Sequence, residues 1–449
     1  MRAILPKNLI LLANACDKPL YVVGGSARDF LANLSAPKWD WDICAPLSAD
    51  EFADIAQKCG FQIKSVFKHT GTVKLQDADR TEYEYTCFRS DKYVRGVHSP
   101  VEIYQTDDIV LDAKRRDFTA NAVYYDIQKD TFVDPLDGIS AIREKRLSTV
   151  APAQKVFGED GLRLMRLARQ SAKLGFTPDE ECLDGAKQNA ELILDISAER
   201  IFAELNAILS ADETYGNKQG VYTGLKLLEE TGVLAHILPE LALGKNMKQR
   251  ADFHKYDVLE HSLKCAFYAP KHIRLAALLH DVGKPFCYLR DGRYHAHPVE
   301  GARLAREILT RWKAPKKETE RVCKLVETHM YDLDCKVKEN KLRRFLVAHY
   351  DLLDDLLLLK QADFSACMDD TSVAPTCRRW EELLQRMRAE NTPFSLKDLA
   401  VNGNDLLAEQ IPPQKISEVL QRLLMHTAIY PQENENARLR KLAIGFLNA

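Results

Sequence analysis

Two aspartates separated by a single tryptophan are the first residues in the chain that could do chemistry together. Asp40 and Asp42 lie in a short aromatic and apolar segment that predicts a β-strand. Residues two apart on a strand point to the same face, so both carboxylates would face one point. They repel each other unless a divalent cation neutralises them, and Mg²⁺ binds carboxylate oxygens together with substrate phosphates. The pair therefore predicts a two-metal site, which activates an attacking hydroxyl and stabilises a leaving oxygen.

A glycine turn precedes the two aspartates. An apolar run ends at Val23, Gly24 and Gly25 follow, and Ser26 and Arg28 lie at the start of a predicted helix. Glycines let the backbone approach a ligand closely, and the free N–H groups of a helix N-terminus suit phosphate. A Gly-Gly pair alone is more often an ordinary strand-to-helix turn, but the aspartates that follow it favour a phosphate site.

These residues carry a resemblance to a known family. Gly-Gly-x-x-Arg-Asp followed by Asp-x-Asp resembles the nucleotidyltransferase superfamily of the DNA polymerase β type and, more narrowly, the class II tRNA nucleotidyltransferases. That family comprises CCA-adding enzymes and similar bacterial poly(A) polymerases. Residues 84–89 and 115–122 resemble two further motifs of the family, in the same order. The resemblance implies that Asp40 and Asp42 hold the catalytic Mg²⁺, with Glu84 near them. It also implies nucleotide binding by the following residues: Gly24, Gly25, Ser26, Arg28, Arg116, Asp117 and Asn121.

A charged stripe on a predicted helix could recognise a base. Asp160, Arg163, Arg166 and Arg169 fall on one half of the helical wheel over residues 159–169. Most such stripes are solvated helix faces, but the surrounding excess of basic residues favours a polyanion site. The segment resembles the family motif Glu-Asp-x-Leu-Arg-x-Leu-Arg-x-x-Arg. The resemblance implies that Asp160 and Arg163 pair with the incoming base, and that Arg166 and Arg169 hold phosphate or support Asp160.

That pairing has a chemical basis. Cytosine and adenine each present an amino donor beside a ring-nitrogen acceptor, which a carboxylate and an arginine can match. Uracil and guanine place a carbonyl where the amino group sits, so an acceptor would face an acceptor. A mispaired buried group costs roughly 1–3 kcal/mol. Asp160 and Arg163 are therefore expected to select CTP and ATP.

Histidines and aspartates recur in the second half of the chain, next to helical segments. They are His261, His280, Asp281, His297, His329 and Asp363. A lone histidine on an apolar helix is more often a core residue than a ligand, but six ordered positions favour a metal site. Imidazole and carboxylate together suit Mn²⁺, Ni²⁺, Fe or Mg²⁺ and can lower the pKa of bound water. The order resembles the HD phosphohydrolase superfamily, which implies phosphodiesterase or phosphatase activity. The alternative is a helical spacer that only carries the tRNA.

The product of the reaction stays open at this point. Gln170 stands where the family usually has phenylalanine, and residues 91–100 lack an acidic residue that the family often shows. In relatives this loop helps to switch specificity from C to A. Full CCA addition, CC-only addition, A-only addition and poly(A) synthesis are therefore alternatives. A further alternative, of another class, is an HD metal-dependent phosphohydrolase acting on RNA ends, whose head only binds RNA.

The elements that must position these residues divide the chain. Strand patterns at 20–23, 41–44, 71–75 and 83–88 and a hairpin at 123–133 alternate with helical patterns, whereas amphipathic helices follow one another beyond residue 155. With the resemblance, this predicts an α+β fold with a polymerase-β-like head, a mixed sheet with helices, followed by all-α neck, HD and tail domains. The expected domains are 1–150 (head), 151–248 (neck), 249–375 (HD) and 376–449 (tail).

Composition excludes several classes of protein. The chain has 449 residues, 46% of them hydrophobic and 29% charged, with a net charge of −2. These values exclude wholesale disorder and a globally basic nucleic-acid binder. Eleven cysteines without a Cys-x-x-Cys pair argue against a zinc ribbon and a disulfide framework, and fit a reducing cytoplasm. No apolar run reaches the ~18 residues that span a membrane. The expected partners are tRNA, CTP and ATP, without a membrane or an obligate protein partner.

Overall fold

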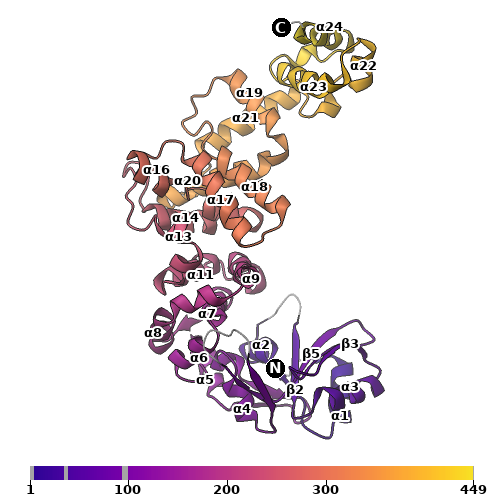
Figure 1. Ribbon diagram of the computed structural model, residues 1–449, viewed down its shortest axis with the longest axis vertical. Coiled ribbons are helices and arrows are strands. Elements are labelled where there is room, and N and C mark those ends of the chain that lie inside the picture. The colour runs from indigo at the N-terminus through magenta and orange to yellow at the C-terminus, as the bar shows by residue number, and fades with distance from the viewer. Residues whose placement is uncertain (1–4, 35–38, 94–99, 448–449) are drawn as a thin grey trace. The chain divides into compact units, whose positions relative to one another are not determined.

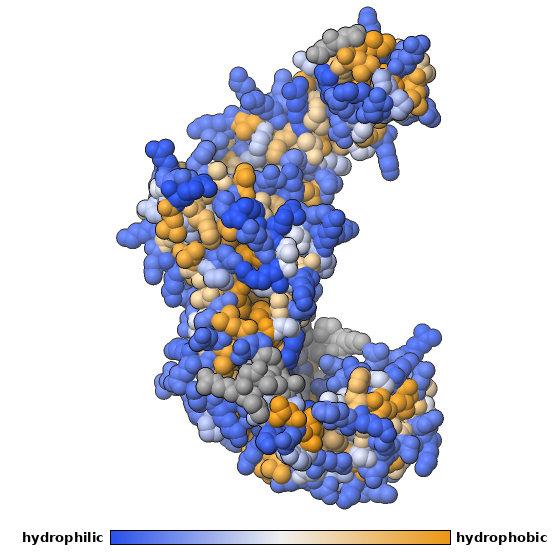
Figure 2. Space-filling view, viewed as in Figure 1, coloured by the Kyte–Doolittle hydropathy of each residue, from blue (hydrophilic) through white to orange (hydrophobic). Residues whose placement is uncertain are grey.

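The computed structural model describes residues 5–34, 39–93 and 100–447, and the chain divides into two compact units (Figure 1). Unit 1 comprises Met1–Ala242 with Arg311–Lys313, and unit 2 comprises Leu243–Thr310 with Ala314–Ala449. On the face shown in Figure 2, hydrophilic residues predominate over both units. Across the described ranges, no helix combines the length and the apolar character needed to cross a membrane.

Unit 1 begins with a head built on a seven-stranded sheet. The strand order is β3-β4-β5-β2-β1-β8-β9. The strands are β1 (Tyr21–Val23), β2 (Trp41–Ala45), β3 (Gln62–Phe67), β4 (Thr72–Gln76), β5 (Glu82–Cys87), β8 (Tyr124–Asp126) and β9 (Thr131–Val133). The pair β2–β5 is parallel and the other neighbours are antiparallel. The predicted mixed sheet and its β8–β9 hairpin are confirmed.

Helices cover this sheet and supply its core. They are α1 (Lys7–Ala15), α2 (Gly24–Ala32), α3 (Ala49–Lys58), α4 (Ile109–Lys114) and α5 (Gly138–Arg143), with the 3₁₀ turn η1 (Thr119–Asn121). Ser48 starts α3 through a capping box with Glu51. Phe52 of α3 is fully buried and stacks on Tyr85 of β5. Helix α2 begins directly at Gly24, so the two glycines predicted to form a turn before the helix belong to its first turn.

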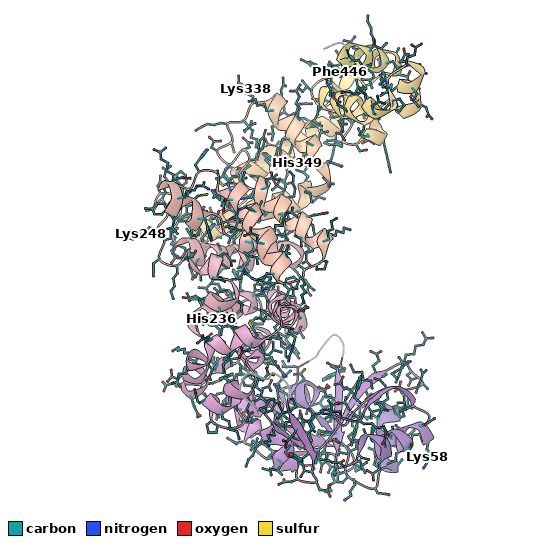
Figure 3. The ribbon with its side chains drawn as sticks, viewed as in Figure 1. Lys58, His236, Lys248, Lys338, His349 and Phe446 are labelled. Atoms are coloured by element: carbon teal, nitrogen blue, oxygen red, sulfur yellow. The ribbon has the colours of Figure 1, made fainter. Side chains whose placement is uncertain are left out.

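The neck completes unit 1. It contains α6 (Ala153–Glu159), α7 (Leu162–Leu174), α8 (Glu180–Gln188), η2 (Ala190–Asp195), α9 (Ala198–Leu209), α10 (Asp212–Tyr215), α11 (Gly220–Glu230), α12 (Val233–Ile237) and α13 (Pro239–Ala242). One departure from an all-α neck is β11 (Thr177–Pro178), which pairs with β10 (Arg146–Leu147). In Figure 3, the labelled Lys58 marks the head and the labelled His236, in α12, marks the neck.

Unit 2 is described as helices alone. Its longer helices are α14 (Val258–Tyr268), α15 (Arg274–Leu279), α16 (Lys284–Asp291), α17 (His297–Arg311), α18 (Lys316–Thr328), α19 (Glu339–Ala348), α20 (Leu353–Met368), α21 (Pro375–Ala389), α22 (Gly403–Ala408), α23 (Pro413–Thr427) and α24 (Asn436–Leu447). Leu356 and Leu359 of α20 are fully buried. The predicted change from a mixed head to helical domains is confirmed.

Candidate active site and metal centre

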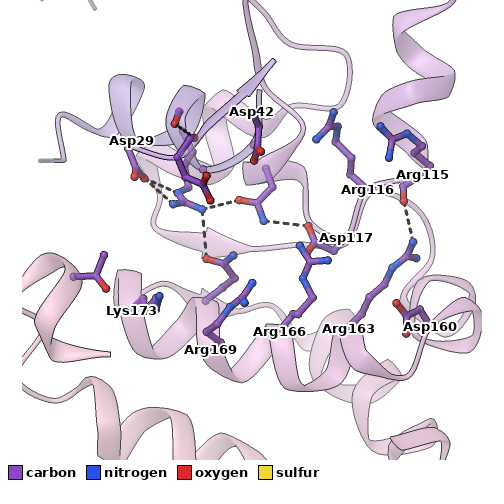
Figure 4. Close-up of a pocket in the computed structure, with 18 of the residues that line it drawn as sticks. Asp29, Asp42, Arg115, Arg116, Asp117, Asp160, Arg163, Arg166, Arg169 and Lys173 are labelled. Carbon is purple, nitrogen blue, oxygen red and sulfur yellow. Dashed lines mark hydrogen bonds and ion pairs between the residues drawn. The ribbon is translucent and has the colours of Figure 1, made fainter. Parts of the chain in front are cut away.

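A pocket of about 610 Å³ lies in unit 1, where the head meets the neck (Figure 4). Seven arginines and one lysine contribute to its lining. Of the residues expected at the nucleotide site, the following line it: Gly24, Gly25, Ser26, Arg28, Asp40, Asp42, Arg116, Asp117, Asn121, Asp160, Arg163, Arg166 and Arg169. Motifs spread over about 150 residues therefore meet in one cavity.

The two aspartates sit where β2 begins. Asp42 belongs to the strand and Asp40 precedes it, and the Ser26 hydroxyl donates to the Asp40 carbonyl at 2.5 Å. Gly24 has a φ of +70°, which favours glycine, and a Cβ there would stand 3.2 Å from Asp42 Oδ2, a tight contact that would press on that carboxylate. Burial, followed by repulsion from Asp40, raises the pKa of Asp42 to about 7. An adjacent cation would relieve both effects, so this donor set fits Mg²⁺.

Glu84 takes a different position from the two aspartates. It pairs with Asp42 across the parallel β2–β5 ladder, so the two residues are neighbours on one sheet face. Its carboxylate is 45% exposed, makes an ion pair with Lys74 at 3.3 Å and does not line the pocket. The expectation that Glu84 acts beside the metals stays untested.

Arg28 is held by partners from both the head and the neck. Its Nε and one Nη donate to Asp29 Oδ1 at 2.9 and 2.7 Å, and the other Nη donates to Asn121 Oδ1 at 2.7 Å. Gln170 of α7 accepts from Arg28 at 3.4 Å, and the Tyr215 hydroxyl of α10 accepts at 3.2 Å. The same Tyr215 hydroxyl donates to Asp29 Oδ2 at 2.6 Å. The network fixes the guanidinium at the N-terminal end of α2.

Arg116 is anchored at the opposite side of the aspartates. It donates to Asp112 Oδ2 at 3.0 Å and to the Tyr124 hydroxyl at 3.2 Å. Burial alone would raise the pKa of Asp112, but the charges of Arg116 and Arg115 and a hydrogen bond from Tyr124 lower it to about 2. Asp112 is therefore an anion at neutral pH and keeps Arg116 charged beside Asp42.

Helix α7 presents three arginines to the pocket in one row (Figure 4). Arg166 forms an ion pair with Asp117 at 2.9 Å, and Arg169 forms one with Glu204 of α9 at 2.9 Å. Arg163 is only 4% exposed, and its two Nη atoms donate to Val156 O, Glu159 Oε2 and Arg115 O. These contacts fix each arginine to a different neighbouring element.

Asp160 stands just before α7. Its Oδ1 accepts from the backbone N–H of Leu162, the first residue of the helix, at 3.0 Å. Its Oδ2 lies 3.9 Å from Arg200. One carboxylate oxygen is therefore bonded to the backbone, and the other makes a long ion pair.

Further residues line the pocket that sequence reasoning did not select. They are Asp29, Trp39, Arg89, Asp91, Tyr93, Arg115, Gln170, Lys173, Thr214 and Tyr215. Arg115 adjoins a motif arginine and Gln170 is visible as a departure from the family pattern. No local sequence pattern marks Tyr215, because its role depends on a contact with Arg28, 187 residues away in the sequence. The divergent loop falls partly on residues 94–99, which lie outside the described residues.

In unit 2 the six predicted histidines and aspartates form one buried cluster. His261 comes from α14, His280 and Asp281 follow α15, His297 starts α17, His329 follows α18, and Asp363 lies in α20. Their exposed fractions are at most 7%. Two sets of ligand atoms in the cluster lie close enough to hold one ion each: His261, His280 and Asp363, and His280, Asp281 and His329. The arrangement gathers four imidazoles and two carboxylates that are far apart in sequence.

Asp281 lies at the centre of this cluster. Its Oδ2 is 3.4 Å from His261 Nε2 and 3.2 Å from His280 Nε2. Its Oδ1 is 3.3 Å from His297 Nε2 and 3.7 Å from His329 Nε2. Within the described part of the chain, neither Asp281 oxygen has a partner in hydrogen-bond geometry. A buried carboxylate in that condition fits a cation on each side of it.

Backbone carbonyls orient three of the four imidazoles. The Nδ1 atoms of His280, His297 and His329 lie 2.7, 2.8 and 2.7 Å from the carbonyls of Ala277, Tyr294 and Val326. These bonds assign one ring proton to Nδ1 and direct Nε2 toward Asp281, where it can donate a lone pair once a metal displaces any proton on it. Burial lowers the pKa of His329 to about 4, which keeps that imidazole neutral. Lys284 Nζ lies 2.6 Å from Asp281 Oδ2 and was not expected there.

Family models match three parts of the chain. "Poly A polymerase head domain" matches residues 20–148, "Probable RNA and SrmB- binding site of polymerase A" matches 175–243, and "tRNA nucleotidyltransferase domain 2" matches 300–443. The first match contains both aspartates and the glycine turn. The third overlaps part of unit 2.

Curated relatives match over most of their length. The A-adding tRNA nucleotidyltransferase of Deinococcus radiodurans is 30% identical over 90% of this chain and 90% of its own. The CCA-adding enzyme of Geobacillus stearothermophilus is 29% identical over 86% and 82%. The CC-adding tRNA nucleotidyltransferase of Thermus thermophilus is 30% identical over 82% and 81%.

Solved structures share the fold. The Bacillus stearothermophilus CCA-adding enzyme in complex with CTP is similar, with a TM-score of 0.69, 24% identity and coverage of 99% of this chain and 98% of that one. The Thermotoga maritima CCA-adding enzyme complexed with tRNA has a TM-score of 0.61, 18% identity and coverage of 99% and 96%. At these identities the structures establish the fold of the chain.

Proposed function

The chain belongs to the class II tRNA nucleotidyltransferases, and we propose that it adds C and A nucleotides from CTP and ATP to the 3′ end of tRNA. The observation that carries the proposal is the shared cavity of Asp40, Asp42 and the charged face of α7. One part of that cavity suits two-metal phosphoryl transfer, and the other offers a carboxylate for base recognition.

Asp40 and Asp42 would hold the divalent metal ions, generally Mg²⁺, that this family uses. When bound, such ions lower the pKa of an attacking hydroxyl and neutralise charge on a leaving pyrophosphate. Asp42 is the more buried of the two carboxylates and has the raised pKa, so it gains the most from a cation. Gly24 leaves the space beside Asp42 free of a side chain.

Cationic groups on both sides of the aspartates would bind the triphosphate. The backbone N–H groups of Gly25 and Ser26 at the start of α2, together with Arg28, form one wall. Arg116 forms the other wall, and Asp117 and Asn121 position Arg166 and Arg28 through the contacts described above. Because the arginines are anchored before substrate arrives, little side-chain entropy is lost on binding.

Asp160 and Arg163 would select the base. The Asp160 oxygen that does not bond to the Leu162 N–H can accept from the amino group of cytosine or adenine. Arg163 is fixed by three acceptors and would donate through its remaining N–H groups to the ring nitrogen or the O2 atom. Arg166 and Arg169 would support this edge of the site or hold phosphate.

The product is tested by extending labelled tRNA transcripts that end at the discriminator base, at C or at CC. CTP and ATP are supplied separately and together, and products are resolved at single-nucleotide resolution. We expect CCA addition followed by a stop. Addition of A only to the CC-ended transcript, of CC only, or of long A ladders would replace CCA addition by the corresponding alternative activity. No addition with any transcript would overturn the proposal.

The cluster around Asp281 supports a second function, metal-dependent phosphohydrolysis on RNA ends or 2′,3′-cyclic phosphates. Burial opposes the charge of Asp281, but His280 and Lys284 hold the pKa of its carboxyl well below the usual range. The site thus offers an anionic carboxylate between two pairs of imidazoles, which suits Mn²⁺, Ni²⁺ or Fe. Such an ion, when bound, lowers the pKa of a coordinated water. Lys284 would bind a phosphate oxygen.

This second function is tested by hydrolysis of 2′,3′-cyclic AMP and of a chromogenic phosphodiester, with Mn²⁺, Ni²⁺ or Mg²⁺ added to metal-free protein. Activity that requires one of these ions and is lost in Asp281→Asn is expected. Hydrolysis that survives the substitution would point to a contaminant. No hydrolysis of either substrate would leave the cluster as part of a helical spacer.

The cellular setting follows from the proposed substrates. All eleven cysteines are free, which agrees with a reducing compartment. We place the protein in the cytoplasm, with tRNA, CTP and ATP as its partners and without an obligate protein partner.

A further inference from the structure

A second group of metal-binding side chains adjoins the Asp281 cluster. His254, His261 and Cys367 each offer one ligand atom, and these atoms lie within 4.8 Å of one another. His254 precedes α14, His261 lies within it, and Cys367 is near the end of α20. Only His261 is shared with the six-residue cluster. The group differs from that cluster in kind, because it contains a thiol and no carboxylate.

Two nitrogen atoms in this group lack the partners that buried nitrogens require. Across the described residues, Nδ1 of His254 and Nδ1 of His261 are buried and make no hydrogen bond. His261 is 0% exposed. The other three imidazoles of the cluster all place Nδ1 against a backbone carbonyl, so His261 is the exception. An unsatisfied buried polar atom is costly, and an absent ion is one of its ordinary explanations.

We propose that His254, His261 and Cys367 form a separate site for a thiolate-binding divalent cation such as Zn²⁺. Sulfur and imidazole nitrogen are the ligands that Zn²⁺ prefers, at about 2.3 and 2.1 Å, so donor atoms within 4.8 Å of one another can share one ion. The thiol proton passes to solvent as the sulfur–metal bond forms. His254 and Cys367 are half-buried, so the site is accessible from outside in a way that Asp281 is not.

The shared histidine links the two sites. A neutral imidazole has one lone pair, so His261 serves one ion at a time unless it also loses its second ring proton. The inference rests on the proposed metal centre only through this residue. The thiolate site needs neither Asp281 nor phosphohydrolase activity, and the two proposals can therefore fail separately.

Cobalt substitution gives a direct test, because Co²⁺ bound to a thiolate shows a sulfur-to-metal charge-transfer band in the near ultraviolet. Metal-free full-length protein is titrated with Co²⁺, and the bound metal is counted after gel filtration. We expect the band in the wild type, its loss in Cys367→Ser, and binding of about one equivalent fewer in that variant. His254→Gln, which alters a half-buried position, should weaken the band and does not depend on the fold tolerating a change in α20.

Three control variants make the result specific. Cys335→Ser changes another partly buried thiol of unit 2 and should keep the band. Asp281→Asn should keep the band while it removes hydrolysis. Cys265→Ser changes a buried thiol close to His280 and should also keep the band. Absence of the band in the wild type, its survival in Cys367→Ser, or its loss in Cys265→Ser would overturn the proposal.

Discussion

The pocket in unit 1 and the cluster in unit 2 both gather carboxylates, yet their surroundings are opposite. Around Asp42 the cavity is lined by seven arginines and one lysine among its residues. Around Asp281 every predicted ligand is at most 7% exposed, and the neighbours are imidazoles. A nucleoside triphosphate brings several negative charges, which explains the cations in the first site. The second site offers ligands to metal ions, with Lys284 as its adjacent cation.

The comparison shows how each site fixes its charged groups. In the unit 1 pocket, arginines are anchored by carboxylates, as in Arg166–Asp117 and Arg169–Glu204. In the cluster, imidazoles are anchored by backbone carbonyls, which fix the tautomer as well as the position. The first arrangement preserves positive charge for phosphate, and the second preserves lone pairs for metal.

The largest expected effect is the loss of nucleotide addition when Asp42 in the head is replaced. Asp42→Asn should reduce nucleotide addition by at least about 10³-fold, because it removes the buried metal-binding carboxylate. Hydrolysis of 2′,3′-cyclic AMP should be unchanged. Single-turnover extension of a CC-ended transcript measures the first, and Asp50→Asn, an exposed aspartate in α3, is the control. Addition within tenfold of the wild type would exclude Asp42 as a metal ligand.

A substitution in the Asp281 cluster should have the opposite pattern, with loss of hydrolysis and retention of nucleotide addition. His280→Gln should lower metal-dependent hydrolysis by at least about 100-fold and leave nucleotide addition within about twofold, since the residue lies in unit 2. His272→Gln alters a half-exposed histidine of the same unit and is the matched control. Loss of nucleotide addition in His280→Gln alone would favour the phosphohydrolase alternative, in which the head only binds RNA.

A smaller effect separates base choice from chemistry. Asp160→Ala removes the acceptor proposed for the amino group of cytosine and adenine. Discrimination against UTP and GTP should fall by about 5–150-fold, the range expected for one mispaired buried group. Competition between nucleotides at equal concentration measures the ratio, with Asp184→Asn in α8 as the control. Unchanged selectivity would assign base choice to other residues.

The smallest effect concerns stability. Because the pKa of Asp42 is raised to about 7, the folded chain holds a proton between about pH 4 and pH 7 that the unfolded chain has lost. The free energy of unfolding therefore falls as pH rises from about 4 to about 7, because only the folded chain must give up that proton. Asparagine stays neutral at both pH values, so Asp42→Asn should stabilise the metal-free protein at pH 8 and leave its Tm unchanged near pH 4. Each kcal/mol of added stability at pH 8 should raise Tm by about 2–4 °C. Scanning calorimetry checks both, and an equal shift at the two values would contradict the raised pKa.

Local patterns were sufficient for much of the fold. Alternating tyrosines in the predicted strand 83–88 correspond to β5, and the capping box of Ser48 with Glu51 explains where α3 begins. Strand β3 escaped prediction because none of its residues is buried and its apolar residues do not alternate regularly with polar ones. The four-domain division stays a prediction, since the structure resolves two compact units.

The sites divide in the same way. Residues in contiguous motifs, such as Asp42 and Arg166, could be selected because their types and spacing carry the chemistry. Tyr215 and Cys367 could not, because their roles arise only when distant helices meet. Glu84 shows that a matching motif does not fix where a side chain points. Its backbone pairs with Asp42 across the β2–β5 ladder, but its carboxylate makes an ion pair with Lys74.

The contact between Arg28 and Tyr215 also bears on the order of synthesis. It closes a loop of 187 residues, so a ribosome must complete the sheet and most of the neck before the partner of Arg28 exists. A nascent chain that ends before residue 215 can form β1 and α2 but leaves that guanidinium with fewer acceptors. Competence to bind nucleotide would then arise late in translation, after the head has folded, and would coincide with the arrival of the neck.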